Sequence, residues 1–287
     1  MKVWLNGNII DQEDAHIAVT DRGLLLGDGI FETMRSHRGR VAWLDRHHER
    51  LKSHAELTGF IPDLLPDISE IADAVGLLCA EFDGEDAVIR LTVTRGSGPR
   101  GLLPPAKCHP TVMMTAAHFA KPAQDNGLVL ATSKQVRRNP WSVANRIKSV
   151  NYLDNIAARR EAAASGADEA LVLSVDGSVA ETTIANLFGV RDGAFYTPPA
   201  DNGIVPGLAR QFIIDWCNDL DVVVHETSIL PNELLSMETV FVCNALQGIR
   251  FVHSIDDVAF KPDQVKTDIL MQLEVEIEKS LCLGIDV

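Results

Sequence analysis

The sequence has no apolar segment long enough to cross a membrane. None of its apolar runs approaches the ~20 residues that a transmembrane helix requires. The amino-terminal stretch MKVWLNGNIIDQEDAH turns polar after five residues, so it lacks the apolar core of a secretory signal. We therefore expect a cytoplasmic protein with no membrane partner.

Cysteine is scarce and is not arranged in pairs. The five cysteines lie far apart, with no C-x-x-C motif and no compact His/Cys cluster, at Cys79, Cys108, Cys217, Cys243 and Cys282. A disulfide framework or a structural zinc site would need such pairs. We expect reduced, buried thiols and predict no metal site.

Positive charge is also in deficit. Lysine and arginine number 26 against 40 aspartates and glutamates, which gives a formal net charge of −14 at pH 7. Most of such a surface would repel a phosphate backbone, so we expect no nucleic-acid partner. An anionic ligand would have to be met by individual arginines or by backbone amides.

The composition that remains is that of an ordinary globular protein. Of 287 residues, 46% are apolar and 23% are charged, enough for one large core or two moderate ones. Strand and helix signals mix along the chain, which favours an α+β fold. Proline, glycine and polar residues gather in AKPAQDNG, where the pattern restarts. We predict two domains, 1–119 and 127–287, joined by a linker at 120–126.

Turn residues and β-branched runs place the elements of the first domain. We predict hairpins over 3–10 and 29–43, a helix from an N-cap at Asp45 to Gly59, and strands over 87–95 and 111–115.

The second domain is predicted to mix strands and helices. The pairs Asp176-Gly177 and Asp192-Gly193 are typical of tight hairpin turns. The other predicted elements are strands over 128–132, 222–226 and 239–245, and helices over 150–165, 207–220 and 262–282.

The loop RGSGPRG, residues 95–101, contains the pattern G-x-G-x-x-G directly after a predicted strand. A dinucleotide site needs a helix to begin at that point. The residues that follow are LLPPAKCHP, and two adjacent prolines prevent such a helix. We interpret the segment as a glycine-rich loop that presents Arg95 and Arg100.

Other common catalytic patterns are missing. His47, His48 and His54 lie on or near one predicted helix, but their spacing matches no zinc site. We expect them on its solvated face. The sequence has no G-x-S-x-G motif that would single out a serine nucleophile.

Two features could bind an anion. Pro206-Gly207 opens a predicted helix, whose first amides at Leu208 and Ala209 lie at the positive end of the helix dipole. An ordinary capped helix is the alternative. In VFVCNALQG, a predicted strand ends at Asn244 and passes into a loop, as strands that line binding sites often do.

Two charged residues have unusual contexts. Glu181 follows a tight hairpin, and strand alternation could turn it inward. A buried carboxylate needs a cationic partner, which we expect a ligand to supply. Lys148 lies between Ile147 and a Ser-Val-Asn-Tyr run that favours the start of a helix. A solvated surface lysine remains the alternative on these residues alone.

The chain resembles the fold-type IV pyridoxal-phosphate enzymes: branched-chain and D-amino-acid aminotransferases and 4-amino-4-deoxychorismate lyase. The similarity extends over about residues 2–258, and its markers are GDGIFETMR (27–35), H-x-x-R-L (47–51), RGSGPRG, IKSVNYL (147–153), DEALVL and VAETTIANLF (168–188), PGLARQF and FVCNALQGI. The resemblance implies a smaller N-terminal α/β domain and a larger C-terminal domain with a barrel-like core. It also implies a homodimer, pyridoxal 5'-phosphate as cofactor, and a small amine substrate that carries a carboxylate.

The resemblance also implies roles for the residues around the cofactor ring. Lys148 would form the Schiff base with the cofactor aldehyde and shuttle protons. Glu181 would pair with the pyridine nitrogen. Tyr152 would reach the ring hydroxyl, although its spacing from Lys148 is one residue shorter than in the branched-chain enzymes.

The cofactor phosphate would be held by a second set of residues. The resemblance assigns this role to Arg50, to the amides of Leu208 and Ala209, and to contacts from Ala245 and Leu246. Aminotransferases often have a threonine where Ala245 stands, so the backbone or Asn244 is expected to substitute.

Local residues favour the lyase subgroup. D-amino-acid aminotransferases have a tyrosine in the place of Phe31 and a histidine in the place of Leu102. Branched-chain enzymes usually have a glycine in the place of Thr33. In the lyases Thr33 would assist proton transfer, Phe31 and Thr33 would line the substrate, and Arg100 would meet its carboxylate. The resemblance therefore favours aminodeoxychorismate lyase, which releases pyruvate and forms 4-aminobenzoate for folate biosynthesis. The alternatives are an aminotransferase for D-amino or branched-chain amino acids and a non-catalytic pyridoxal-phosphate-binding protein.

Overall fold

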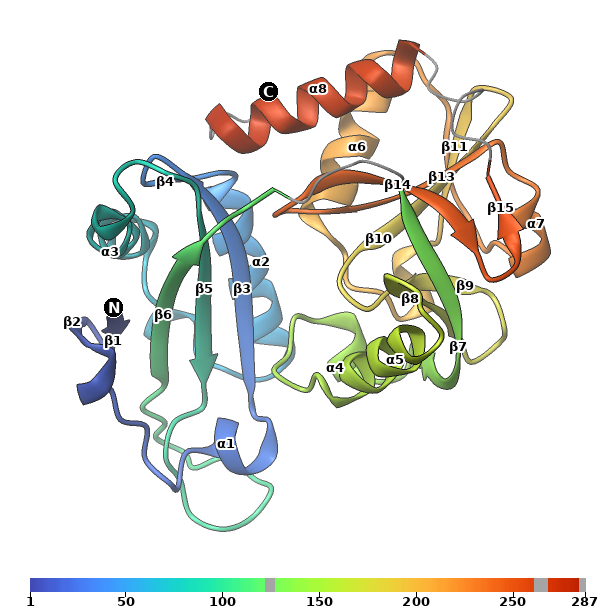
Figure 1. Ribbon diagram of the computed structural model, residues 1–287. Helices are drawn as coiled ribbons and strands as arrows, with labels where there is room; N and C mark the ends of the chain where they lie inside the picture. Colours follow the sequence, from blue (N-terminus) through green and yellow to red (C-terminus); the bar gives the residue numbers. More distant parts are fainter. Residues whose placement is uncertain (122–126, 261–267, 284–287) are drawn as a thin grey trace. The chain divides into compact units, whose positions relative to one another are not determined.

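The computed structural model in Figure 1 describes residues 1–121, 127–260 and 268–283. The chain forms two compact units. The first contains Met1–Ala120, Ile147–Asn151 and Lys279–Val287, and the second contains Lys121–Arg146 and Tyr152–Glu278. Residues 122–126 of the predicted linker lie outside the described residues. Unlike the predicted domain 127–287, the second unit excludes residues 147–151, because main-chain hydrogen bonds join them to the first.

The first unit is built on a six-stranded antiparallel sheet in the order β2-β1-β6-β5-β3-β4. Its strands are β1 (Lys2–Leu5), β2 (Asn8–Asp11), β3 (Gly29–His37), β4 (Arg40–Val41), β5 (Ala87–Thr94) and β6 (Thr111–His118). Its helices are α1 (Arg22–Leu26), α2 (Leu44–Leu57) and α3 (Ile68–Cys79), with 3-10 turns η1 (Gln12–Asp14), η2 (Pro62–Leu64) and η3 (Ala80–Phe82).

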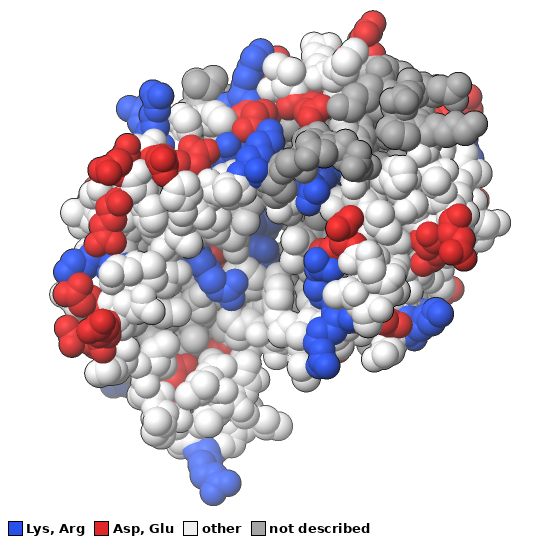
Figure 2. Space-filling model, viewed as in Figure 1, with Lys and Arg blue, Asp and Glu red and all other residues white. Residues whose placement is uncertain are grey.

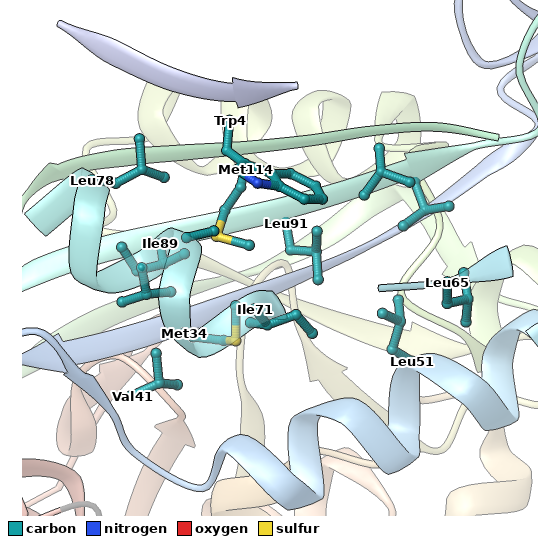
Figure 3. Close-up of a cluster of buried hydrophobic side chains, with 14 of the residues drawn as sticks. Trp4, Met34, Val41, Leu51, Leu65, Ile71, Leu78, Ile89, Leu91 and Met114 are labelled. Atoms are coloured by element: carbon teal, nitrogen blue, oxygen red, sulfur yellow. The ribbon is translucent and has the colours of Figure 1, made fainter. Parts of the chain in front are cut away.

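The hydrophobic core of the first unit lies between the sheet and helices α2 and α3 (Figure 3). Met34, Leu91 and Met114 reach it from three adjacent strands, and Leu51 and Ile71 reach it from the two helices. Alternate residues of a strand point to opposite faces. The residues between these core positions therefore lie on the other face of the sheet, where Phe31 and Thr33 are found.

Two details of these helices differ from the predictions. Helix α2 begins at Leu44 behind Trp43, whose φ of 54° is left-handed, so Asp45 lies in the first turn and is not the N-cap. Helix α3 was not predicted. Its start is stabilised by a capping box, in which Asp67 and Glu70 each accept a hydrogen bond from the other's backbone N–H.

The second unit contains a mixed nine-stranded sheet in the order β12-β11-β10-β13-β14-β7-β8-β9, with β15 paired to β14. Its strands are β7 (Leu128–Arg138), β8 (Glu169–Ser174), β9 (Val179–Thr182), β10 (Asn186–Arg191), β11 (Ala194–Thr197), β12 (Val224–Glu226), β13 (Thr239–Asn244), β14 (Gly248–Ile255) and β15 (Val258–Ala259). The last strand in the order, β9, contacts β10 without pairing to it, so the sheet curls on itself. The predicted α+β fold with a barrel-like core in its second part is confirmed.

Helices and one 3-10 turn complete this part of the chain: α4 (Val143–Arg146), α5 (Leu153–Ala164), η4 (Ala200–Asn202), α6 (Leu208–Asp219), α7 (Pro231–Leu235) and α8 (Asp268–Leu283). Helix α5 packs Ala158 and Ala162 against Val136 and Val172 of the sheet, where small side chains allow close approach. It begins at Leu153, three residues after the predicted start. Residues 262–267 of the predicted last helix lie outside the described residues.

The surface carries both signs of charge. On the face drawn in Figure 2, the lysine and arginine side chains of the described residues are interspersed with aspartate and glutamate. Within the described ranges, no helix combines the length and the apolar character needed to span a bilayer.

Candidate active site

Lys148 lies in a turn whose main chain is hydrogen-bonded to strand β3. Its carbonyl oxygen accepts a 2.8 Å hydrogen bond from Phe31 N, and Val150 N donates to Gly29 O at 3.0 Å. Ser149 forms a β-bridge with Ile30. Lys148 is half-buried, and its Nζ lies 4.6 Å from the centroid of the Phe31 ring. The lysine is therefore held by β-type pairing and not by the start of a helix.

Helix α2 presents a polar face to the sheet of the first unit. His47, Arg50 and His54 recur at intervals of three and four residues and share one side of the helix. Their counterpart is the buried Glu32 of β3. Arg50 Nη2 lies 2.6 Å from Glu32 Oε2 and Arg50 Nε lies 2.9 Å from Oε1, while His47 Nδ1 lies 2.7 Å from Oε2.

Burial and the neighbouring charges together shift the pKa values of Glu32 and His47. Burial alone would raise the pKa of Glu32, but Arg50 and His47 hold that pKa well below its usual range. Burial lowers the pKa of His47, and Glu32 opposes that change. Arg50 is thus fixed by a bidentate ion pair, and its contact with a phosphate remains a prediction.

The prediction that the three histidines are solvated is wrong. His47, His48 and His54 are buried, at 1%, 6% and 3% exposure. Each has a polar partner, which makes burial of the ring tolerable: His47 pairs with Glu32, His48 Nε2 lies 3.1 Å from Pro66 O, and His54 Nδ1 accepts a 3.2 Å hydrogen bond from Lys148 N.

Phe31 and Thr33 lie on the sheet face opposite the core. Thr33 is half-buried and is paired in register with Arg90 of β5. The guanidinium carbon of Arg90 lies 3.8 Å from the centroid of the Phe31 ring. Because Lys148 Nζ also lies over that ring, the predicted substrate residues Phe31 and Thr33 share a face with the predicted cofactor lysine.

The glycine-rich loop presents only one of its two arginines. Arg95 is buried, forms an ion pair with Asp28 at 3.0 Å and donates to the carbonyl oxygens of Thr58 and Gly59. Its guanidinium stabilises the fold, so the expectation that the loop presents it is wrong. Arg100 is exposed, and its contact with a substrate carboxylate remains a prediction.

A buried arginine holds the end of that loop. Arg22 donates to Gly101 O at 3.0 Å and to Leu102 O at 2.8 Å, and its Nε pairs with Asp28 at 2.8 Å. Burial raises the pKa of Asp28, but the hydrogen bonds from Arg95 and Arg22 hold it below its usual value.

In the second unit, Glu181 points inward from strand β9. It is 4% exposed, and its Oε1 lies 3.0 Å from Nε of the buried Arg138. Its Oε2 accepts hydrogen bonds from Asn186 Nδ2 at 3.3 Å and from Val205 N at 3.2 Å. All four residues of β9 are buried, so the burial of Glu181 reflects the packing of the whole strand and not an alternation of buried and exposed positions. The expectation that only a ligand supplies the cation is wrong, since Arg138 provides one.

Asn186 links the Glu181 carboxylate to the segment that precedes helix α6. Asn186 Nδ2 also donates to Val205 O at 2.9 Å, and a Cβ at Gly207 would collide with Asn186 Oδ1. Gly207 is the N-cap and provides no side-chain cap. The first amides of α6, at Leu208 and Ala209, therefore form an uncapped helix N-terminus of the kind that binds anions.

The turn between β13 and β14 is closed by its own asparagine. Asn244 Oδ1 accepts hydrogen bonds from Leu246 N at 3.0 Å and from Gln247 N at 2.9 Å. The amide of Leu246 therefore has an acceptor within the turn. Ala245 is half-buried, and replacement of the family threonine there by the backbone or by Asn244 remains a prediction.

Comparison with known proteins identifies the family. Residues 29–255 match the family described as Amino-transferase class IV. The chain belongs to this family. Class IV aminotransferases depend on pyridoxal phosphate, so the predicted family and cofactor are confirmed.

Relatives in the class IV family include both kinds of enzyme. A Methanocaldococcus jannaschii protein named "Putative branched-chain-amino-acid aminotransferase" is 35% identical over 267 residues, with 92% of this chain and 91% of that protein covered. A Staphylococcus epidermidis D-alanine aminotransferase is 31% identical over 284 residues, with 97% of each covered. A Bacillus subtilis aminodeoxychorismate lyase is 30% identical over 275 residues, with 94% of this chain and 92% of that protein covered.

Solved structures of both kinds of class IV enzyme are similar to this chain. The branched-chain aminotransferase from Thermoproteus uzoniensis with norvaline has a TM-score of 0.88 at 28% identity, covering 99% of this chain and 95% of the other. The 4-amino-4-deoxychorismate lyase from Pseudomonas aeruginosa has a TM-score of 0.82 at 27% identity, covering 98% and 99%. The chain is thus an enzyme of the class IV family, either an aminotransferase or a lyase.

The second unit by itself contains groups that fit the class IV cofactor. A phosphorylated pyridine needs an anion site and a carboxylate for its ring nitrogen. The uncapped start of α6 and the buried Glu181 provide these two groups, and Asn186 bonds to the segment before α6 and to Glu181. Tyr152 is half-buried immediately before α5, and its contact with the ring remains a prediction.

Several buried polar residues that contact the predicted site residues were missed from the sequence. Glu32, Arg138 and Asn186 were assigned no role, and His54 was assigned to solvent. The i, i+3, i+7 spacing of His47, Arg50 and His54 was a usable signal, because these positions lie beside the apolar Leu51 on a helix. Nothing local indicated that Arg138 would pair with Glu181, which is 43 residues away (181 − 138).

Proposed function

We propose that this chain is a 4-amino-4-deoxychorismate lyase. It would eliminate pyruvate from aminodeoxychorismate and form 4-aminobenzoate, a step of folate biosynthesis. The observation that carries the proposal is the position of Thr33. Its hydroxyl lies on the same face of β3 as Phe31, whose ring is 4.6 Å from Lys148 Nζ. A hydroxyl there suits proton transfer, and glycine, the usual residue in branched-chain aminotransferases, would not provide one.

The residues that the family resemblance names would hold the cofactor. Lys148 would bind its aldehyde carbon, Glu181 would accept a hydrogen bond from its ring nitrogen, and Tyr152 would be a further ring contact. The amides of Leu208 and Ala209 would bind its phosphate, with contributions from Arg50, Asn244, Ala245 and Leu246. When bound, pyridoxal phosphate supplies an electron-withdrawing ring that accepts charge from the substrate carbon.

The remaining steps belong to the chain's own side chains. Lys148 would remove the proton next to the substrate amine and hold it at its Nζ while the C–O bond to the enolpyruvyl group breaks, and the departing pyruvate would take up that proton. Thr33 assists this transfer, and Phe31 provides an apolar wall beside it. Arg100 pairs with a substrate carboxylate, which suits an exposed guanidinium on a loop that Arg22 anchors.

We further propose a homodimer in the cytoplasm. Each unit carries large apolar side chains with high exposure, including Leu102 at 84% and Leu103 at 86% in the first and Trp141 at 88% in the second. We propose that a second copy of the chain covers part of this apolar surface. All five cysteines are free thiols, which suits a reducing compartment.

An aminotransferase is the second candidate. The Methanocaldococcus jannaschii relative is more similar, at 35% identity, than the Bacillus subtilis lyase at 30%. In that reaction Lys148 would again remove the proton next to the substrate amine, a keto acid would be released, and the amino group would pass to an acceptor keto acid. The two candidates differ only in the fate of the substrate after the first proton transfer.

The deciding experiment gives the purified protein both kinds of substrate. Aminodeoxychorismate is supplied first, and release of pyruvate and 4-aminobenzoate is measured. D-alanine or a branched-chain amino acid is then supplied with 2-oxoglutarate, and keto acid and glutamate are measured. The lyase proposal requires pyruvate release to be the faster reaction by kcat/KM, with the Lys148→Ala protein inactive in both assays. Faster amino transfer, with no 4-aminobenzoate formed, would replace the proposal by the second candidate.

A further inference from the structure

His54 contacts the main chain of the predicted cofactor lysine. It lies near the end of α2, is 3% exposed, and its Nδ1 accepts a 3.2 Å hydrogen bond from Lys148 N. Both residues belong to the first unit. No resemblance or comparison assigned this histidine a role, and the sequence alone suggested a solvated side chain.

The hydrogen bond fixes one of the two peptide planes that flank Lys148. The peptide after it is fixed by strand β3, because Phe31 N donates to Lys148 O at 2.8 Å. The peptide before it contains Lys148 N, and His54 ties this plane to helix α2. Since the two planes together set φ and ψ at Lys148, they also set the direction in which its side chain leaves the backbone.

The bond requires a neutral imidazole with its proton on Nε2, so that Nδ1 can accept. Burial, together with the nearby charges of Arg50 and Lys148, lowers the pKa of His54 to about 4, although Glu32 on β3 opposes this change. His47, on the same face of α2, is itself paired with Glu32. His54 is therefore a neutral acceptor at neutral pH.

We propose that His54 is a positioning residue that orients Lys148 for attachment of pyridoxal phosphate. The inference rests on the proposed role of Lys148 as the cofactor-binding lysine. It differs from a purely structural role because it predicts effects on the Lys148 amide and on the reactivity of the Lys148 amine, beyond effects on folding.

Four variants separate the hydrogen bond from the bulk of the ring. His54→Leu fills the space but has no acceptor, and His54→Ala tests the same loss if leucine does not fit. His54→Asn restores an acceptor, since the asparagine Oδ1 occupies a position equivalent to Nδ1. His48→Leu is the matched control, because His48 lies on the same helix, is also buried, and has Pro66 O as its partner.

Two measurements are made on each folded variant. Hydrogen exchange of the Lys148 amide is followed by NMR in cofactor-free protein, with the Phe31 amide as the internal control for folding. The rate at which pyridoxal phosphate attaches to Lys148 is followed by borohydride reduction and peptide mass spectrometry. Losing one hydrogen bond should accelerate the exchange and slow the attachment by about fivefold to tenfold each. His54→Asn should recover most of both rates, and His48→Leu should change neither.

Different results would overturn different claims. If Lys148 exchange in His54→Leu and His54→Ala equals that of the wild type, the hydrogen bond has no role. If exchange accelerates but attachment keeps its wild-type rate, His54 does not position the amine, and the inference is overturned while the proposed function stands. If the wild-type protein itself attaches no pyridoxal phosphate at Lys148, the proposed function fails, and this inference fails with it.

Discussion

Arg138 Nε lies 3.0 Å from Glu181 Oε1 in the interior of the second unit, and both side chains are at most 6% exposed. The pair explains how a carboxylate can stay buried on strand β9. It also determines the position of Oε1, while Asn186 and Val205 N determine that of Oε2. Glu181 is therefore oriented by its own chain before any ligand binds.

Removing Arg138 should strongly destabilise the protein. Arg138→Leu leaves Glu181 buried without its cation, which costs about 3–5 kcal/mol. The double variant Arg138→Leu/Glu181→Leu should recover a large part of this loss. Urea unfolding of the two variants measures both quantities. Arg137→Leu, at the exposed neighbouring position, should change stability by only about 0.5 kcal/mol. Equal losses of unfolding free energy in Arg137→Leu and Arg138→Leu would show that the buried ion pair contributes no more to stability than an exposed arginine.

Replacing Lys148 should remove the covalent site of the cofactor. Lys148→Ala is expected to lose the visible absorbance that lysine-bound pyridoxal phosphate produces, because no other amine would replace Nζ over the Phe31 ring. Spectra of the dialysed protein test this. Lys134→Ala, at an exposed position on β7, should keep the absorbance. Persistence of the band in Lys148→Ala would assign the cofactor to a different lysine.

Thr33 should matter to the lyase reaction through its hydroxyl. Thr33→Val keeps the shape of the side chain, and we expect it to lower kcat for pyruvate release by about 10²-fold or more. Thr33→Ser should retain most of the rate. Thr115→Val is a matched control, since Thr33 and Thr115 pair with Arg90 from opposite sides. A Thr33→Val enzyme with wild-type kcat would exclude the hydroxyl from proton transfer.

His54 should produce a pH dependence of stability. Its pKa is 6.5 in a model compound and about 4 in the folded chain, so as the pH falls the unfolded chain takes up the proton first. The free energy of unfolding should therefore decrease between about pH 6.5 and pH 4, by about 3 kcal/mol in total for this residue. Above that window its contribution should be constant.

Denaturant unfolding at several pH values measures the effect, with His54→Asn as the comparison because asparagine does not titrate. As the pH falls from about 6.5 to about 4, the free energy of unfolding of the wild type should decrease relative to that of His54→Asn, and outside this window the difference should be constant. Parallel curves for the wild type and His54→Asn would mean that His54 is as easily protonated in the folded chain as in the unfolded one.

Gly207 should be intolerant of a side chain despite an ordinary backbone conformation. Its φ of −74° and ψ of 142° suit any residue, but a Cβ would collide with Asn186 Oδ1. Gly207→Ala should therefore cost about 1–3 kcal/mol of stability through overpacking and weaken pyridoxal-phosphate binding. In Gly76→Ala, where a Cβ meets no atom within 4 Å, stability should rise by about 0.5–1 kcal/mol. Thermal unfolding and cofactor titration compare the two, and a neutral Gly207→Ala would show that Asn186 moves freely.

Local patterns predicted much of the second unit. The turns at Asp176-Gly177 and Asp192-Gly193 lie between paired strands, as expected. The start of α6 after Gly207 was predicted to within one residue. These features depend on interactions between near neighbours in the chain, which a sequence displays directly. The capping residues Asp67 and Glu70 were an equally local signal for α3 that was overlooked.

Long-range pairing could not be predicted in the same way. The residues after Ile147 favoured a helix, but they form β-type hydrogen bonds to Gly29 and Phe31, more than a hundred residues away. The three histidines of α2 looked solvated because their partners, Glu32, Pro66 O and Lys148 N, come from other parts of the chain.

By itself, the sequence determined the residue types, the order of the motifs that relate the chain to class IV aminotransferases, and the turns and helix starts that local chemistry favours. Only the tertiary structure decided that His54 accepts from Lys148 N and that Arg138 neutralises Glu181. The physical reason is that a buried polar group must find a partner wherever folding brings one near. That partner depends on how distant strands and helices pack together, which local sequence patterns do not show.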